Sequence, residues 1–324
     1  MRSEIPAGVK IPKGVVVLGS LNTDFVLAVP HLPRPGETVA GGSLATHPGG
    51  KGANQAVAAA KLGAPVAMVG RVGDDSFGRA LRRSLIGAGV DVSGVAADPA
   101  AASGAALILV DPQAENAIAI APGANAQVGQ ADVERALSLL SAGDLLVLQL
   151  EIPLAAVEHA GRQAQRGGAQ VLLNAAPAAP LSDDLLRTVD VLIVNEDEAA
   201  SISGLAGEQA GRELRRRGAS AVITTRGSQG VVVEGERRIG LPAHEVTAVD
   251  TTAAGDAFVG GLAAALAAGA NLVTGARLGS AVAAAAVTRH GAQSSLPDRK
   301  ELLRITGLDW EAALAQAGTA THTR

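Results

Sequence analysis

Short apolar runs alternate with longer Ala-rich or amphipathic stretches through most of this chain. Strand-like and helix-like segments that alternate in this way predict a mostly parallel sheet covered by helices. Buried parallel strands read as continuous β-branched and leucine runs, and such runs lie at residues 15–21, 65–70, 145–150, 170–174, 191–194, 221–225 and 230–234. The expected helices lie at residues 52–62, 77–86, 154–166, 208–217, 254–268 and 272–289.

Two stretches, residues 24–46 and 103–121, break this alternation because they contain short strands with no helix between them. We expect these strands to form a small antiparallel sheet, a lid beside the α/β body, at residues 25–29, 39–44, 105–110 and 117–121. The sequence therefore predicts one domain over residues 14–310 that includes the lid. Residues 1–13 are expected to be a flexible N-terminal extension, and residues 311–324 a C-terminal tail that frays.

The composition is that of a globular protein with an aliphatic core. Of 324 residues, 48% are hydrophobic and 18% charged, and only three Phe and one Trp supply aromatic rings. So few rings argue against a stacking platform for nucleic acid, and a net charge of −4 favours neither a polyanion nor an acidic membrane as partner. The lack of cysteine excludes disulfides, thiol catalysis and Cys-ligated zinc. With no recognisable secretory signal and no apolar run of the ~18–20 residues that span a membrane, we expect a cytoplasmic protein.

The most informative stretch is V-D-T-T-A-A-G-D-A-F at residues 249–258, which opens an Ala-rich helix. The small residues Ala253, Ala254 and Gly255 let an anion approach N–H groups of the first helical turn. Those groups have no intrahelical acceptor and lie at the positive end of the helix dipole. Asp256 follows directly, and a carboxylate beside an anion cradle suits a base that deprotonates a hydroxyl during phosphoryl transfer. The alternative is an aspartate that only complements the helix dipole.

Polar residues also follow the predicted strands, where open α/β sheets bind ligands. After the first strand, Asn22 and Asp24 offer an amide and a carboxylate that suit sugar hydroxyls, although alone they fit an ordinary Asx turn better. The run G-G-K-G-A-N at residues 49–54 opens a helix without Walker A spacing. Its glycines permit either a close approach of the backbone to a ligand or a simple tight turn.

Acidic residues end two further strands, at Glu151 and at Asn195–Glu198. They either cap the next helix or orient a hydrated Mg²⁺, and the sequence leaves both roles open. The loop T-R-G-S-Q-G at residues 225–230 is either a hairpin turn or a loop that contacts nucleotide phosphates. The six histidines have no metal-binding spacing, and the run Arg215–Arg217 is expected to be a solvated helix end.

Together these motifs resemble the ribokinase (PfkB-type) carbohydrate kinase family over about residues 15–303. Two specific motifs carry the resemblance in the right order, G-G-K-G-A-N-Q-A near the start and D-T-T-A-A-G-D near the end. Shorter motifs are also similar, namely G-S-L-N-T-D (19–24), G-D-D-S-F-G (73–78), P-G-A-N (122–125), Q-L-E (149–151) and N-E-D-E (195–198). The resemblance implies a ribokinase-like three-layer αβα sandwich with a mostly parallel central sheet and a small antiparallel β lid.

The resemblance also implies roles for matching residues. Asp256 is the expected general base, beside an anion hole at Ala253, Ala254 and Gly255. The residues expected to hold the sugar are Asn22, Asp24, Gly50, Lys51, Asn54 and Glu151. Those expected to bind ATP are Asn195, Thr225, Gly227, Ser228, Gly230, Gly255 and Ser280, with Mg²⁺ oriented through water by Glu198. An activating K⁺ is expected at Asp250, Thr252, Ala286, Arg289, Gly291 and Ser295, several through backbone carbonyl groups only.

The implied activity is ATP-dependent phosphorylation of D-ribose at O5 to give D-ribose 5-phosphate. The nearest alternative is another sugar or nucleoside kinase of the family, acting on deoxyribose, fructose or adenosine, although scarce aromatics count against a purine acceptor. A catalytically idle sugar-binding regulator is less consistent with the intact Asp256 and anion hole. The resemblance and the apolar lid strands also imply a homodimer joined through the lid.

Overall fold

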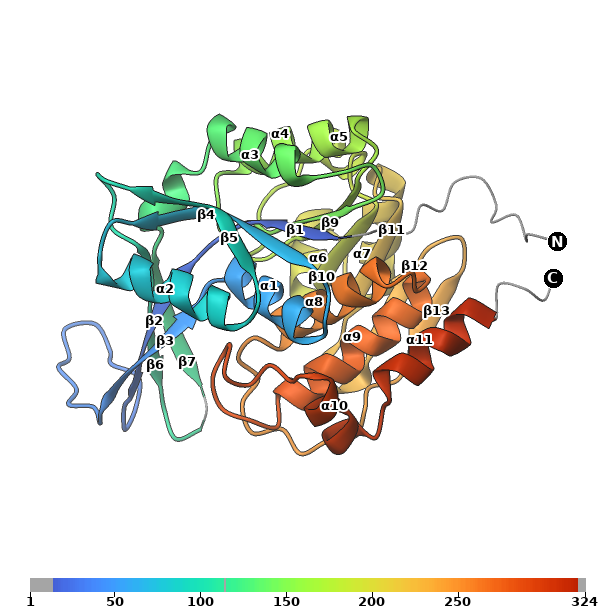
Figure 1. Ribbon diagram of the computed structural model, residues 1–324. Helices are drawn as coiled ribbons and strands as arrows, with labels where there is room; N and C mark the ends of the chain where they lie inside the picture. Colours follow the sequence, from blue (N-terminus) through green and yellow to red (C-terminus); the bar gives the residue numbers. More distant parts are fainter. Residues whose placement is uncertain (1–13, 114, 320–324) are drawn as a thin grey trace.

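The computed structural model describes residues 14–113 and 115–319, so the N-terminal extension expected at 1–13 lies outside the described residues. A large α/β body carries a small second sheet at one side (Figure 1). The expected architecture, a mostly parallel sheet between helices with a small β lid, is confirmed.

The body is built on a nine-stranded sheet in the order β13-β12-β11-β10-β9-β8-β1-β4-β5. All neighbours in it pair in parallel except β11–β12 and β12–β13. The chain order reverses between β1 and β8, which makes that position the topological switch point of the sheet. The strands are β1 (Val15–Leu18), β4 (Val66–Gly73), β5 (Asp91–Asp98), β8 (Leu145–Leu148), β9 (Gln170–Asn174), β10 (Val191–Asn195), β11 (Ala221–Thr225), β12 (Val231–Glu234) and β13 (Arg238–Leu241).

Helices cover both faces of the sheet, and two clusters of buried aliphatic side chains fill the two interfaces (Figure 1). One face packs against α3 (Gln130–Leu139), α4 (Leu154–Arg166), α5 (Asp183–Leu186), α6 (Glu196–Ser203) and α7 (Glu208–Arg217). The other face packs against α1 (Lys51–Lys61), α2 (Ser76–Gly87), α8 (Ala254–Ala267), α9 (Leu272–Ala286), α10 (Arg299–Thr306) and α11 (Trp310–Thr319). Among the described helices, none is long and apolar enough to cross a bilayer.

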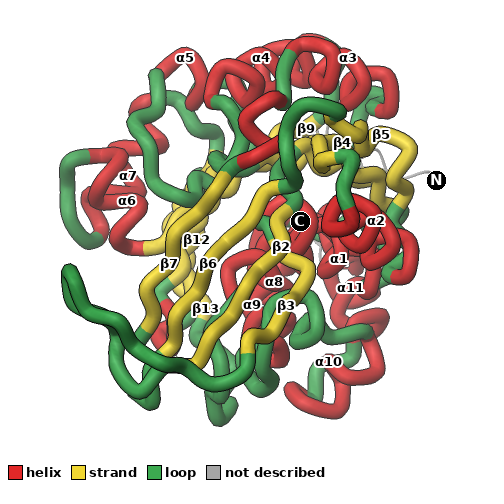
Figure 2. Tube along the Cα trace, turned by 90° about the vertical axis from the view of Figure 1, so that its left-hand side faces the viewer, coloured by secondary structure: helices red, strands yellow, loops and turns green. Residues whose placement is uncertain are grey.

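The lid is a four-stranded sheet in the order β3-β2-β6-β7, seen nearly face on in Figure 2. The pairs β2–β3 and β6–β7 are antiparallel, whereas β2–β6 is parallel. Its strands are β2 (Asn22–Ala28), β3 (Leu44–Gly49), β6 (Gly104–Val110) and β7 (Asn116–Ala121). The edge-to-face ring pair Phe25–Phe77 joins β2 to α2, with ring centroids 5.4 Å apart.

The strand expected at residues 39–44 is wrong, because β3 begins only at Leu44. Gly41 and Gly42 explain the difference. The Gly42 N–H donates to the Ala28 carbonyl, and a Cβ on Gly41 would lie 2.8 Å from the same oxygen. The chain therefore turns at this glycine pair before it can pair as a strand.

Several other expectations need correction. The helix expected to reach residue 289 ends at Ala286, because the Val287 carbonyl accepts from the N–H groups of Val249 and Asp250. Much of the tail expected to fray from residue 311 is helical in α11, and Trp310 anchors it, with Leu314 also packed against the core. Residues 320–324 lie outside the described part of the chain. The sequence reading did not identify β5, β13, α3, α5, α6 or α10.

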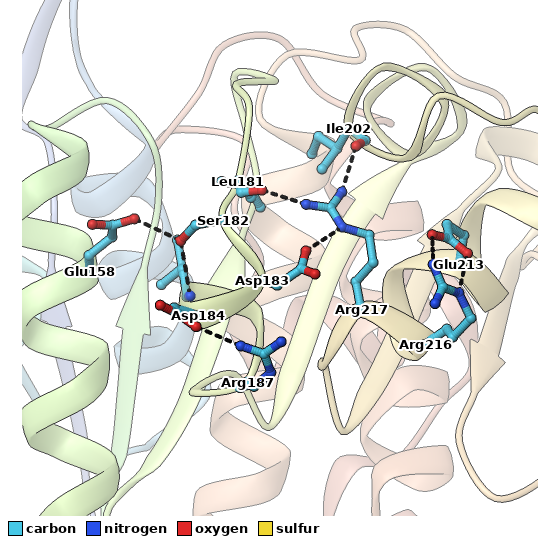
Figure 3. Close-up of polar contacts among 11 residues, drawn as sticks. Glu158, Leu181, Ser182, Asp183, Asp184, Arg187, Ile202, Glu213, Arg216 and Arg217 are labelled. Carbon is cyan, nitrogen blue, oxygen red and sulfur yellow. Dashed lines mark hydrogen bonds and ion pairs between the residues drawn. The ribbon is translucent and has the colours of Figure 1, made fainter.

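The arginine run at the end of α7 is only partly a solvated helix end. Arg216 is exposed and pairs with Glu213, as expected. Arg217, however, is only 18% exposed, and its guanidinium donates to the Asp183 carboxylate and to the carbonyl groups of Leu181 and Ile202 (Figure 3). This side chain therefore ties α7 to α5 and to the end of α6.

Candidate active site

The predicted site residues from the first half of the chain meet at the carboxyl ends of β1 and β8, beside the switch point. The Ser20 hydroxyl donates to Glu151 Oε2 at 2.6 Å, and the Lys51 N–H donates to the same oxygen at 3.1 Å. The turn after β1, the turn after β8 and the start of α1 are thereby joined. This is where an open α/β sheet binds its ligands.

Two glycines of the G-G-K-G run bring α1 onto the turn after β1. Gly50 has a φ of 90°, and a Cβ there would lie 2.7 Å from the Asn22 nitrogen. A Cβ on Gly52 would lie 2.7 Å from the Ser20 nitrogen. Both positions need glycine, because any side chain would push the helix away from the strand. At these two positions the glycines permit close packing of protein backbones, a role that the sequence analysis did not consider.

Asp256 is buried, and both oxygens of its carboxylate are hydrogen-bonded from α1. Asn54 Nδ2 donates to Oδ2 and Gln55 Nε2 donates to Oδ1, each at 2.9 Å. Gln55 Nε2 also donates to Asn174 Oδ1 at 3.0 Å, and Gln149 Nε2 donates to Gln55 Oε1 at 2.7 Å. Buried carboxylates need such donors, because an unpaired charge in the interior is very costly. Sequence reasoning missed Gln55 and Asn174, because only tertiary contacts bring them to Asp256.

The start of α8 has an unusual conformation. Ala253, its N-cap residue, has a φ of 58° and is the only non-glycine residue with a positive φ among those described. No side chain caps the helix, although the Ala254 N–H donates to the Thr251 carbonyl. The N–H groups of Gly255 and Asp256 have no hydrogen-bond partner within the described part of the chain. A strained residue beside free N–H groups is typical of an anion-binding functional site.

A cavity of about 280 Å³ opens beside this helix start. It is lined by Ala253, Ala254, Gly255 and Asp256 together with Lys51, Asn195, Glu198 and Thr225. Gly227 and Ser228 lie just beyond β11 in the short helix Gly227–Gln229, and Gly230 follows it. Ser280 is buried within α9 and does not line this cavity.

Glu198 and Asn195 form a capping box at the start of α6. The Glu198 N–H donates to Asn195 Oδ1 at 2.7 Å, and the Asn195 N–H donates to Glu198 Oε2 at 2.8 Å. Burial raises the pKa of Glu198 above its usual range, although the bond from Asn195 opposes this shift. The helix-cap role that the sequence left open is therefore realised, while Glu198 also faces the cavity.

A second cavity, of about 330 Å³, lies under the lid and is lined by Asn22, Glu151 and Asn125 and by Ile120 of β7. Asn125 was not among the predicted site residues. Its Nδ2 donates to Asn22 Oδ1 at 2.7 Å, and its Oδ1 accepts from the Leu21 N–H at 2.9 Å. Because the Asn22 oxygen is already bonded, its Nδ2 is the group left to donate to a ligand.

Three acidic groups and one lysine set the electrostatics between the two cavities. Burial, then the negative charges of Glu151 and Asp256, raises the pKa of Asp24 from its usual 3.8 to about 7. The charge of Asp256 is the main reason why the pKa of Lys51 is raised, so that lysine stays protonated. The site thus combines a fixed positive charge with a carboxyl group that titrates near neutral pH.

The residues expected to hold a monovalent cation also lie together, around the loop after α9. Asp250 Oδ1 accepts from the Thr252 N–H and its Oδ2 from the Gly291 N–H, each at 2.8 Å. Burial works against ionisation of Asp250, but these bonds outweigh it and lower its pKa. Arg289 Nη2 donates to the Ser295 carbonyl at 2.6 Å, and the Arg289 N–H donates to the Ala286 carbonyl. Among the described residues, no group of three or more His, Cys, Asp or Glu side chains could hold a metal ion.

Comparison with known proteins shows which family this sequence resembles. The family described as pfkB family carbohydrate kinase matches residues 12–299. Ribokinase of Haemophilus influenzae is 41% identical over 301 residues, which cover 90% of this chain and 98% of that protein. Deoxyribokinase of Salmonella typhimurium is 36% identical over 303 residues, which cover 91% of this chain and 99% of that protein.

A solved structure has the same fold. Arabidopsis thaliana ribokinase, complexed with ribose and ATP, superposes with a TM-score of 0.83 at 30% identity and covers 92% of this chain and 99% of that one. Fold, site geometry and sequence likeness over nearly the whole length lead to one conclusion. This chain belongs to the pfkB family of carbohydrate kinases.

Proposed function

We propose that this protein catalyses the ATP-dependent phosphorylation of D-ribose at O5, giving D-ribose 5-phosphate and ADP. The observation that carries the proposal is the buried Asp256 carboxylate, held by two amides beside free N–H groups at the start of α8. A relative named ribokinase, similar over 90% of this chain, and a solved ribokinase with ribose and ATP support the choice of substrates.

In this proposal Asp256 is the general base. It takes the proton from the ribose O5 hydroxyl as the O5–phosphorus bond forms and the bond from the γ-phosphorus to the bridging oxygen of ADP breaks. The N–H groups at Ala253–Gly255 hold the charge that develops on the phosphoryl oxygens, together with Lys51. Beside the left-handed Ala253 the N–H groups of Gly255 and Asp256 have no partner within the described residues, whereas the Ala254 N–H would have to be shared with the Thr251 carbonyl.

The sugar would lie in the second cavity, the lid-side cavity lined by Asn22, Asn125, Glu151 and Ile120. Asn22 and Glu151 line this cavity and offer an amide Nδ2 and carboxylate oxygens, and the buried Asp24, close enough to Glu151 for their charges to repel, is the third proposed contact. Asn54 Oδ1 is buried and has no partner among the described residues, so it is ready to accept from a sugar hydroxyl. Gly50 and Lys51 complete the proposed contacts at the start of α1.

ATP would occupy the cavity at the start of α8, the α8-side cavity, against Asn195 and Thr225, with Gly227, Ser228 and Gly230 in the loop just beyond β11. Ser280 lies farther off in α9 and is the weakest member of the proposed set. Glu198 fits a water-mediated Mg²⁺ site, because its carboxylate lines the cavity and Mg²⁺ keeps most of its waters. When bound, Mg²⁺ would neutralise charge on the phosphates of ATP.

A K⁺ ion would be held by Asp250 and by neutral oxygens of Thr252, Ala286, Arg289, Gly291 and Ser295. One carboxylate among carbonyl groups suits a large monovalent ion better than Mg²⁺. The Ser295 and Ala286 carbonyls already accept bonds from Arg289, so their remaining lone pairs would have to serve. Equal rates in K⁺ and in a bulky inert cation would contradict this part of the proposal.

In this proposal a second copy of the chain covers aliphatic side chains that the lid leaves exposed on both of its faces, of which Ile120 also borders the cavity under the lid. Leu44, Leu107, Ile118 and Ile120 are each about half exposed, which is unusual for clustered aliphatic side chains. We infer a homodimer of cytoplasmic protomers, each a single unit over residues 14–310 with its lid against the partner's lid. A fully active particle of about 32 kDa in dilute solution would exclude this arrangement.

The decisive experiment is a coupled assay of ADP release with a panel of acceptors. D-ribose is expected to give a higher kcat/KM than 2-deoxyribose, fructose or adenosine, because a site that bonds a hydroxyl leaves polar groups unpaired when it is missing. The deoxyribokinase relative makes 2-deoxyribose the second candidate. A higher kcat/KM for 2-deoxyribose would keep the kinase and change its substrate, and no turnover with any acceptor would favour a sugar-binding regulator.

A further inference from the structure

The start of α8 departs from a rule that other helices of this chain obey. In α3, α6 and α10, the acidic residue at the third helical position accepts a hydrogen bond from the backbone N–H of its own N-cap residue. The acceptors are Asp132 at 2.9 Å, Glu198 at 2.8 Å and Glu301 at 3.0 Å. Asp256 holds the same third position in α8, yet no side chain caps that helix. An acidic residue at this position normally folds back because the N-cap N–H needs an acceptor.

One of the two contacts that hold Asp256 away comes from Gln55, which lies in a buried chain of amides. Gln149 Nε2 donates to Gln55 Oε1 at 2.7 Å, and Gln55 Nε2 donates to Asp256 Oδ1 at 2.9 Å. Gln149 and Gln55 are fully buried, so water does not compete for these bonds. Because the Gln55 oxygen is already an acceptor, only its Nε2 can be turned toward Asp256.

We propose that Gln55, braced by Gln149, is a positioning residue that prevents the Asp256 carboxylate from folding back onto the first turn of α8. Two consequences follow. The carboxylate stays directed at the acceptor hydroxyl, and the N–H groups of the helix start stay free for the phosphoryl group. Asn54 also holds Asp256, but it is an expected sugar ligand, whereas Gln55 has no proposed contact with the sugar or with ATP. The catalytic consequence rests on the proposed kinase function; the geometric one does not.

The test is the variant Gln55→Met, which keeps the length of the side chain and removes its donor. With ribose and ATP, kcat is expected to fall about 10–100-fold, because small displacements of a reacting group have effects of this size. The KM for ribose is expected to stay within about threefold, since Gln55 makes no proposed sugar contact. A crystal structure of the variant is expected to have Asp256 within hydrogen-bond distance of the Ala253 N–H. In an Asp256→Asn background, Gln55→Met is expected to cause no further loss.

Two further variants separate positioning from folding. Gln149→Met leaves Gln55 in place without its brace and is expected to lower kcat in the same direction but less. Gln165→Met removes an amide near the end of α4 that donates to the Arg187 carbonyl, and it is expected to leave kcat unchanged. A Gln55→Met enzyme with wild-type melting temperature, wild-type kcat and an unmoved Asp256 would overturn the inference. If the wild type phosphorylates no acceptor, the proposed function fails, and the position of Asp256 in the variant crystal still decides the geometric claim.

Discussion

Helices α8 and α10 pack on the same face of the sheet, yet their first turns are opposite in character. The start of α10 is satisfied locally, because the Glu301 N–H donates to Asp298 Oδ1 at 2.8 Å and the Asp298 N–H donates to Glu301 Oε2 at 3.0 Å. The start of α8 has a left-handed Ala253, no capping side chain and an aspartate held by another helix. Both helices thus have an acidic residue at the third helical position and use it for different ends.

The difference shows how a functional site is separated from a structural one. A capping side chain contributes about 1 kcal/mol to stability, and α8 gives that contribution up. Helix α1 holds Asp256 of this turn through Asn54 and Gln55, and surrounding contacts of this kind allow a strained backbone to persist. An anion bound at this turn would supply the missing hydrogen bonds, so the protein is expected to be more rigid there with nucleotide bound.

The largest effect is expected when Asp256, at the start of α8, is replaced. Asp256→Asn should lower kcat by about 10²–10⁴-fold, the usual contribution of a general base, while ribose and ATP still bind. Steady-state kinetics and calorimetric titration of both ligands measure the two parts. A variant within fivefold of wild-type turnover would show that Asp256 is a structural residue like Glu301.

The next effect concerns Asp24, whose buried carboxyl group has a pKa raised to about 7. In the unfolded chain the Asp24 carboxyl group ionises near pH 3.8. Its contribution to the free energy of unfolding is therefore fully present below that pH, and it is lost as the pH rises through 7. The loss between pH 4 and 8 is at most about 4 kcal/mol. Asp24→Asn should therefore lack this decline and be more stable than wild type at pH 8, while binding ribose poorly.

Urea unfolding of wild type and Asp24→Asn at pH 5 and pH 8 measures this difference. Asp298→Asn is the matched control, because it makes the same chemical change at the exposed start of α10, away from the acidic groups of the site. If the stability of wild type relative to Asp24→Asn is the same at both pH values, Asp24 ionises normally in the folded protein.

A smaller effect is expected at the start of α6, where one acidic residue both caps the helix and lines a cavity. Glu198 closes a capping box and also lines the α8-side cavity. Gln at this position can still accept from the N-cap N–H, so Glu198→Gln should keep the melting temperature. Loss of the charge should raise the Mg²⁺ concentration for half-maximal activity by about tenfold. Wild-type Mg²⁺ dependence in this variant would mean that Glu198 is only a helix cap.

The smallest effect is at the start of α10. Asp298→Ala removes the acceptor for the Glu301 N–H and should lower the free energy of unfolding by about 0.5–2 kcal/mol. Turnover at saturating substrates should be unchanged, because Asp298 lines neither cavity. A large loss of kcat without loss of stability would remove the distinction between the two helix starts.

The sequence by itself determined the parallel body and most of its elements. Runs such as Val15–Leu18 and Leu145–Leu148 are apolar at every position, which is typical of strands covered on both faces. The strand expected at 39–44 failed because a glycine pair turns the chain there, and α6 was not identified because its short run of acidic residues has no clear apolar face. Local pattern carries information about burial, but little about where a short element begins.

The motifs also located the candidate base and the helix start beside it, because small residues before an aspartate have a local meaning. Only the tertiary structure decided what Asp256 does with its carboxylate. The acids at the same position in α3, α6 and α10 fold back onto their own helices, whereas Asp256 is turned toward the cavities by Asn54 and Gln55, about two hundred residues earlier in the chain. Hydrogen bonds between distant segments leave no periodic signal in a sequence, since they depend on how α1 and α8 pack and not on either helix alone.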